Sequence, residues 1–132
     1  MPGILLFYMN EASLKHYFDA LTAARAIHIF ADGKTFDDYR SSDLLSSAIE
    51  RKFEIIGEAL NRIKRQYPED LQAIGDWPGN IGFRNILAHA YDHVEDAVVW
   101  GIVTRQIPDF IRELERIPGL DPQSDDYHEE DL

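Results

Sequence analysis

The chain has 132 residues, enough for one compact domain and too few for two ordinary ones. Its 13 Lys and Arg stand against 24 Asp and Glu, and the net charge of −11 argues against general binding to nucleic acid or anionic membranes. The absence of cysteine excludes disulfide-stabilised secreted mini-proteins, thiolate catalysis and sulfur-ligated metal sites, so a cytoplasmic location is expected.

The two ends of the chain differ from its middle. Residues 1–8 are uncharged, lack the basic flank of a signal peptide, and are too few to span a membrane, so they are expected to form an N-terminal extension. Residues 121–132 hold six acids and no Lys or Arg, which leaves 13 basic against 18 acidic groups (24 − 6) in the rest. We expect a domain over 9–119 and an acidic, disordered tail over 120–132, serving solubility or acting as a decoy for a basic groove.

The first helix is expected over residues 11–31, with Asn10 as its cap and Gly33 just past its end. Its apolar positions follow the three- and four-residue spacing of one helical face. They are Leu14, Tyr17, Phe18, Leu21, Ala24 and Ile27. Residues 34–42 read as a loop with room for one helical turn.

The second helix is expected over residues 43–67 and should stop at Pro68. Its apolar residues cover about half of the circumference, more than one neighbouring helix can bury. They are Leu45, Ala48, Ile49, Phe53, Ile55, Ile56, Ala59, Leu60 and Ile63. The width indicates a central helix of a bundle or one that also forms a subunit interface. Lys52 falls inside this arc, where it could reach out to water or face a phosphate.

The second half of the chain predicts three further elements. A connector with a short helix around residues 71–74 precedes a third helix over 81–89. The fourth helix should begin at Asp92, with Glu95 and Asp96 in its first turn. Its apolar stripe runs first through Val94, Ala97, Val98, Gly101 and Ile102, and then through Ile107, Phe110, Ile111, Leu114 and Ile117. We expect Pro108 to bend the helix between the two sets, and Pro118 and Gly119 to end it.

No segment shows the alternation of apolar and polar residues that is typical of strands. The expected fold is all-α, an up-and-down bundle of about four main helices. The chain also lacks the Walker loop, the dinucleotide fingerprint, the nucleophile elbow and the HExxH zinc pattern.

The chemically informative stretch is residues 82–93, GFRNILAHAYDH. Arg84 can bind phosphate oxygens with two N–H groups, and His89 can transfer a proton near neutral pH. On a continuous helix Asn85 and His89 share a face, whereas Arg84 lies about 140° from His89. The two groups therefore meet only if the helix ends near His89 or if two chains contribute to one cleft.

Two other interpretations of this stretch remain open. Arg84 could pair with a carboxylate, Asn85 and Tyr91 could satisfy backbone groups, and His89 could be a core histidine. Alternatively His89 and His93, four residues apart, could bind a metal with nearby acids. A break in the helix between the two histidines argues against the metal site.

The run Arg84-Asn85-Ile86-Leu87-Ala88-His89-Ala90-Tyr91, followed by Val94 and Trp100, resembles the signature of HEPN-domain proteins of the HepT toxin type. The segment AIERKFEIIGEALNRI at 48–63 resembles the second helix of that family. The similarity extends over about residues 9–117. The ends of the chain lie outside it.

The resemblance implies a helical bundle that forms a homodimer, with Arg84 and His89 of both protomers at a shared cleft. It implies a metal-independent endoribonuclease that needs no cofactor, and a cognate minimal nucleotidyltransferase antitoxin that adenylylates Tyr91. We hypothesise attack by the RNA 2′-hydroxyl, with His89 as acid or base, Arg84 stabilising the phosphorane and Asn85 orienting His89 or a phosphate oxygen.

Because the chain is acidic, RNA needs local cations. Lys52 and Arg51 are candidate phosphate contacts, joined by Arg62 or Arg65. The rival hypothesis is a HEPN dimer that binds a nucleotide or the nucleotidyltransferase without cutting RNA.

Overall fold

Helix α2, Glu11–Ala31, has the bounds that the sequence predicts. The computed structural model describes residues 9–75 and 94–120. Asn10 caps the helix because its Oδ1 accepts a 2.7 Å hydrogen bond from the N–H of Ala12. The buried face of α2 is formed by Ser13, Tyr17, Ala20, Leu21, Ala23, Ala24 and Ile27. The expectation that Phe18 belongs to this face is wrong, because its side chain is 41% exposed.

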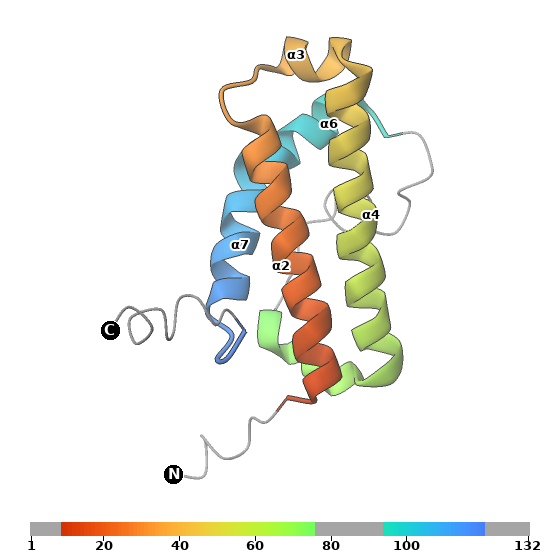
Figure 1. Ribbon diagram of the computed structural model, residues 1–132, viewed down its shortest axis with the longest axis vertical. Coiled ribbons are helices and arrows are strands. Elements are labelled where there is room, and N and C mark those ends of the chain that lie inside the picture. The colour runs from red at the N-terminus through yellow and green to blue at the C-terminus, as the bar shows by residue number, and fades with distance from the viewer. Residues whose placement is uncertain (1–8, 76–93, 121–132) are drawn as a thin grey trace, which may run out of the picture.

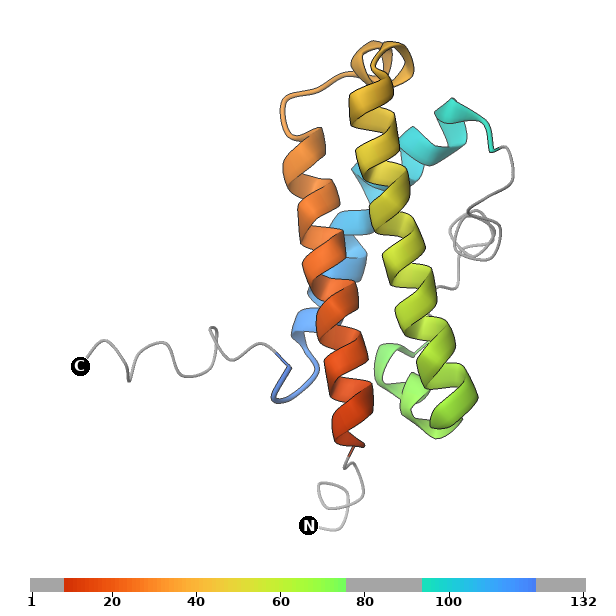
Figure 2. The ribbon, with the colours of Figure 1, turned by 45° about the vertical axis from the view of Figure 1, so that its right-hand side comes forward.

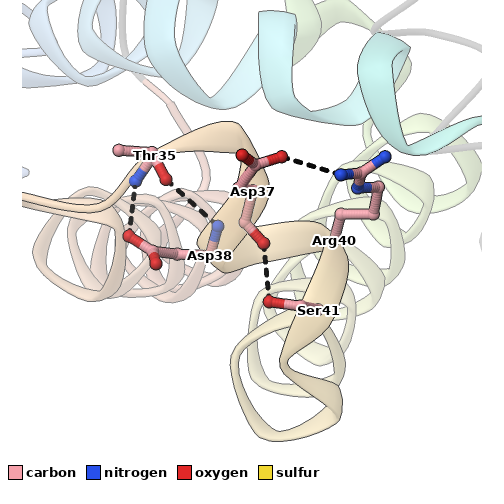
Figure 3. Close-up of polar contacts among 5 residues, drawn as sticks. All are labelled: Thr35, Asp37, Asp38, Arg40 and Ser41. Carbon is pink, nitrogen blue, oxygen red and sulfur yellow. Dashed lines mark hydrogen bonds and ion pairs between the residues drawn. The ribbon is translucent and has the colours of Figure 1, made fainter.

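Helix α3, Phe36–Ser41, is the helical turn expected between the two long helices. Thr35 begins it with a reciprocal cap: its hydroxyl accepts from the N–H of Asp38 at 3.1 Å, and its own N–H donates to Asp38 Oδ2 at 2.8 Å (Figure 3). Tyr39 is the buried residue of α3 and packs its ring on Trp100, with ring centroids 5.5 Å apart. This contact joins α3 to the later helix α6.

Helix α4, Asp43–Gln66, is the second long helix and runs antiparallel to α2 (Figure 1). Ser42 caps it by accepting a hydrogen bond from Leu45 N, and Pro68 follows its end as predicted. The prediction that the apolar arc of α4 is wider than one neighbour can bury is confirmed. One part of the arc is buried, α4 contacts α2, η1 and α3, and the rest of the arc is half-buried. The buried set is Ile49, Phe53, Ile56, Gly57, Ala59, Leu60 and Ile63. The 3₁₀ helix η1, Pro68–Ile74, follows and contains the predicted short turn.

The chain resumes with α6, Asp96–Gly101, the π-helical turn η2, Ile102–Gln106, and α7, Ile107–Glu115. These three elements cross behind the α2–α4 pair, and η2 and α7 pack on α2 (Figure 2). An ion pair of 2.8 Å between Arg25 and Glu115 links α2 to α7.

The predicted start and register of this last limb are wrong. The backbone of Glu95 is extended, with ψ 138°, so α6 begins at Asp96 instead of Asp92. Its buried residues are Val99, Ile102 and Val103, while Val98 is 44% exposed. The register changes in η2, where Ile107 N donates to Ile102 O, five residues back. The wider turn adds one residue before Pro108, and the two apolar stripes are joined across it.

The described residues are helices and their connections, without a strand, which confirms the all-α class. Residues 81–89 and Asp92, expected as a helix and a cap, lie outside the described residues. Within 9–75 and 94–120, no helix is both long and apolar enough to cross a bilayer.

Candidate functional site

The predicted catalytic residues Arg84, Asn85 and His89, together with Tyr91, belong to residues 76–93, outside the described part of the chain. The described residues on either side are held by the core. Ile74 at the end of η1 is 1% exposed, and Val94 packs against the buried cluster. The structure therefore describes the frame on either side of this segment and the four cations predicted to serve RNA, which are Arg51, Lys52, Arg62 and Arg65.

The frame on the entry side is fixed by a buried carboxylate. Asp70 of η1 is 6% exposed and accepts a 2.7 Å hydrogen bond from the Ser13 hydroxyl. The N–H of Asn10 reaches the same Oδ2 at 3.3 Å, and the Tyr17 hydroxyl donates to the Asp70 carbonyl at 2.8 Å. Burial, followed by the nearby Asp70 charge, raises the pKa of the Tyr17 phenol. These bonds attach the first turns of α2 to the last described element before residue 76.

The frame on the exit side is acidic. Burial, the charge of Asp96 and the charge of Glu54 together raise the pKa of Glu50. Burial, and then the same Glu50 and Asp96 charges, also raise the pKa of Tyr39. Carboxylates of α4 and α6 therefore lie close to one another near the start of α6, and this end of α4 does not favour RNA phosphate.

The two predicted phosphate contacts, Arg51 and Lys52, differ in whether their charge is already paired within the protein. Arg51 donates to Glu54 Oε1 at 3.0 Å, so its charge is already paired, although its side chain is 59% exposed. Lys52 is half-buried and has no hydrogen bond or ion pair with another described residue. Of the two, Lys52 is the cation left available to a ligand.

Lys52 lines an open groove of about 280 Å³ between α2 and α4, which we call the α2–α4 groove. The lining residues are Phe18, Asp19, Thr22 and Ala23 of α2 and Lys52, Ile55, Glu58, Ala59 and Arg62 of α4. Sequence reasoning named Lys52 and Arg62 as possible RNA contacts but assigned Phe18 to the core. Tyr17, Leu21, Ala24 and Ile27 already complete the buried stripe, and that pattern leaves Phe18 one residue off the face.

The metal hypothesis involves His89 and His93, which lie outside the described residues. In the described ranges themselves, no group of three His, Asp or Glu side chains is placed to hold a metal ion.

Comparison with known proteins assigns the chain to a family. The family model described as Ribonuclease HepT-like matches residues 20–117. A Methanocaldococcus jannaschii protein with a provisional RNase name is 28% identical over 81% of this chain and 98% of its own length. A second protein of that organism, also provisionally named an RNase, is 28% identical over 76% of this chain and 82% of its own length.

A Thermococcus cleftensis protein, provisionally named ribonuclease HepT, is 31% identical over 83% of this chain and 98% of its own length. No solved structure gives a significant match. The matched span covers α4, the limb α6–α7 and the Arg84–Tyr91 signature between them. The chain therefore belongs to the Ribonuclease HepT-like family.

Proposed function

We propose that this protein is a metal-independent endoribonuclease and the toxin of a toxin–antitoxin pair, acting in the cytoplasm. The observation that carries the proposal is membership of the HepT-like ribonuclease family together with the Arg84–His89 spacing inside the matched span. The named relatives support ribonuclease activity as the class. The cofactor-free chemistry and the toxin role are our proposals.

The proposed reaction is an internal transesterification of RNA. The ribose 2′-oxygen attacks the adjacent phosphorus, the bond to the 5′-oxygen breaks, and the products carry a 2′,3′-cyclic phosphate and a 5′-hydroxyl. His89 takes the proton from the 2′-hydroxyl or gives one to the leaving oxygen. Arg84 stabilises the negative charge of the phosphorane, and Asn85 orients His89 or a phosphate oxygen.

The proposed active form is a homodimer, in which Arg84 and His89 of both protomers share one cleft. The physical reason is the angle of about 140° between the two positions on a continuous helix, which keeps Arg84 and His89 of one chain apart. Lys52 is proposed as a phosphate contact because it is unpaired among the described residues. Arg51 would contribute only after giving up its pair with Glu54.

The proposed antitoxin is a cognate minimal nucleotidyltransferase that transfers AMP to the Tyr91 hydroxyl. Tyr91 follows His89 by two residues, so a bulky anionic group there would obstruct the cleft and repel RNA phosphate. The hydroxyl oxygen attacks the α-phosphorus of ATP and pyrophosphate leaves. Modification would therefore silence the ribonuclease.

The test incubates the purified protein with 5′-labelled RNA in the presence of EDTA and identifies the product ends by mass spectrometry. We expect cleavage with cyclic phosphate ends. His89→Ala and Arg84→Ala should each lower the rate by about 10² to 10⁴ without loss of the folded state. His28→Ala, at an exposed position of α2, is the matched control and should cleave normally.

The possible failures are distinct. Loss of cleavage on adding EDTA contradicts metal independence. Full cleavage by His89→Ala contradicts the assigned role of the imidazole. RNA binding without cleavage by the unmodified protein indicates the rival binding module.

A further inference from the structure

The described lining of the α2–α4 groove combines three features that suit a nucleic acid strand. Its floor is formed by small side chains, its walls carry cations that form no ion pair with another described residue, and a partly exposed aromatic ring contributes to its lining. We propose that this groove binds single-stranded RNA, with phosphates on Lys52 and Arg62 and one base stacked on Phe18. The proposal rests on the proposed ribonuclease function and extends it to a substrate-binding surface outside the cleavage motif.

The floor of the groove is set by residues that cannot fill the space between the helices. Ala23 of α2 and Ala59 of α4 are 2% and 3% exposed, and each side chain ends at Cβ. The two helices run antiparallel (Figure 1). Longer side chains from both helices also line the groove and form its walls. The resulting volume of about 280 Å³ is near the lower end for small-ligand sites, which suits one nucleotide unit of a strand.

The walls supply positive charge in an acidic protein. Lys52 and Arg62 have no ion pair with any other residue of 9–75 or 94–120, whereas Arg51 is paired with Glu54. The two free cations are ten residues apart on α4, about 15 Å along the helix axis. That distance allows contacts with separate phosphates of one strand.

The acids of the groove do not cancel this charge. Asp19 is already paired with Lys15 at 3.2 Å. Counting pairs among the described residues, Glu58 is then the unpaired acid of the groove against two unpaired cations. The last eight residues of α4, 59–66, add Lys64 and Arg65 and contain no acid. This end of α4 therefore carries a local excess of basic residues in a chain whose net charge is −11.

The ring of Phe18 gives the groove a surface for a base. Its side chain is 41% exposed on α2, beside the hydroxyl of Thr22, and both residues line the groove. Stacking on an aromatic ring is available to every base and is the common way in which proteins hold single strands without reading sequence. Phe18, Lys52 and Arg62 thus supply the two features that single-strand binding sites combine, an aromatic ring for stacking and cations for phosphates.

A second copy of the chain fits the groove less well. The centre of a protein interface is depleted of charged residues. Four of the nine residues that line this groove are charged: Asp19, Lys52, Glu58 and Arg62. Unpaired cations around an exposed ring favour a polyanion with bases over an apolar protein surface.

The test measures RNA binding by the full chain with His89→Ala, which prevents cleavage during titration. The probe is a fluorescein-labelled oligouridylate of about 12 nucleotides, long enough for one strand-binding site, and the readout is fluorescence anisotropy at several salt concentrations. Lys52→Ala and Arg62→Ala should each weaken binding and reduce the slope of log affinity against log salt by about 0.7, the value for one phosphate contact on a single strand. Arg112→Ala, an exposed position on α7, is the matched control.

Variants at Phe18 and Glu58 distinguish loss of a direct RNA contact from disruption of the local fold. Phe18→Ala should weaken binding about tenfold with an unchanged salt slope, and Phe18→Tyr should restore it. Glu58→Gln should tighten binding severalfold, because it removes the unpaired acid from the groove. A groove with a purely structural role would not gain affinity from this change.

The proposal is overturned if the groove variants bind RNA like Arg112→Ala, while the wild-type chain still cleaves RNA. In that case the ribonuclease function stands and the groove is not its binding surface. If Phe18→Ala instead converts a dimer to a monomer in sedimentation, and the affinity follows the oligomeric state, the groove is an interface between copies. If the wild-type chain neither binds nor cleaves RNA, the proposed function itself fails.

Discussion

Ser13 Oγ donates a 2.7 Å hydrogen bond to Asp70 Oδ2, and the two residues lie 57 positions apart in the chain. Ser13 is fully buried and Asp70 nearly so. The bond fixes the start of α2 to η1, immediately before the segment that carries Arg84 and His89. A serine near the start of the described sequence therefore holds η1, the last described element before residues 76–93.

Ser13→Ala should lower the free energy of unfolding by about 1–3 kcal/mol, because it leaves the buried Asp70 carboxylate without one of its donors. Urea denaturation measures the difference. Ser41→Ala is the control, since Ser41 is exposed and donates only to Asp37 O of its own helix, and it should change stability by less than about 0.5 kcal/mol. Equal effects of the two substitutions would contradict the special role of the Ser13–Asp70 contact.

The two buried phenols should respond oppositely to loss of the hydroxyl. Tyr17→Phe removes the 2.8 Å bond to the Asp70 carbonyl and should cost about 0.5–1.5 kcal/mol. Tyr39→Phe should cost nothing or stabilise, because the buried Tyr39 hydroxyl has no hydrogen-bond partner within residues 9–75 and 94–120. Thermal unfolding at neutral pH tests the pair, and a larger loss for Tyr39→Phe would show that its hydroxyl is satisfied in solution.

Glu50→Gln should stabilise the fold at pH 7 and lose this effect in acid. The folded state raises the pKa of Glu50 through burial and the charges of Asp96 and Glu54. A group with a raised pKa gives its full stability below its unfolded pKa of about 4.3, and loses it as pH rises through the folded pKa. The neutral Gln avoids that loss, by about 0.5 kcal/mol or less for so exposed a group. Unfolding curves at pH 7 and near pH 4 check this, and a difference that is independent of pH would contradict it.

Gly101→Ala should stabilise the α6–η2 junction by up to about 1 kcal/mol. Gly101 has helical dihedral angles, φ −61° and ψ −38°, where alanine is preferred over glycine. A Cβ there would approach Arg105 Nη2 at 2.9 Å, and this is the mobile end of an exposed side chain that can move away. The melting temperature should rise. A fall would indicate that the Arg105 side chain is needed where it lies.

Tyr91→Phe should keep ribonuclease activity and resist modification by the proposed antitoxin. The ring remains, but the oxygen that would attack ATP is gone. Intact-mass measurement after incubation with ATP and the nucleotidyltransferase should show added AMP on the wild-type chain and none on the variant. Continued labelling of the variant would identify a different acceptor.

The long helices α2 and α4 could be predicted because their signals are local. Asn10 and Ser42 cap them with their own side chains, and Pro68 cannot continue the helix that ends before it. The spacing of their apolar residues then determines which face of each helix is buried. Phe18 was assigned to the wrong face because it is apolar and next to Tyr17, although the stripe was complete without it.

The limb from Asp96 onward could not be predicted in the same way. An acidic run containing Glu95 and Asp96 suits a helix start at Asp92 equally well, and only the packed structure holds Glu95 extended. The π-turn of η2 has no sequence signature of its own. It follows from the need to bury both Ile102 and Ile107 against α2 on either side of one added residue.

The sequence by itself determined the long helices α2 and α4, the all-α class and the Arg84-to-Tyr91 signature, because caps, periodicity and motif spacing act between residues a few positions apart. The tertiary structure alone decided that Ser13 meets Asp70 and that Phe18 faces Lys52 and Arg62 across a groove. These relations join residues tens of positions apart. They depend on how α2 and α4 pack, and no local spacing fixes the angle and offset at which two helices meet.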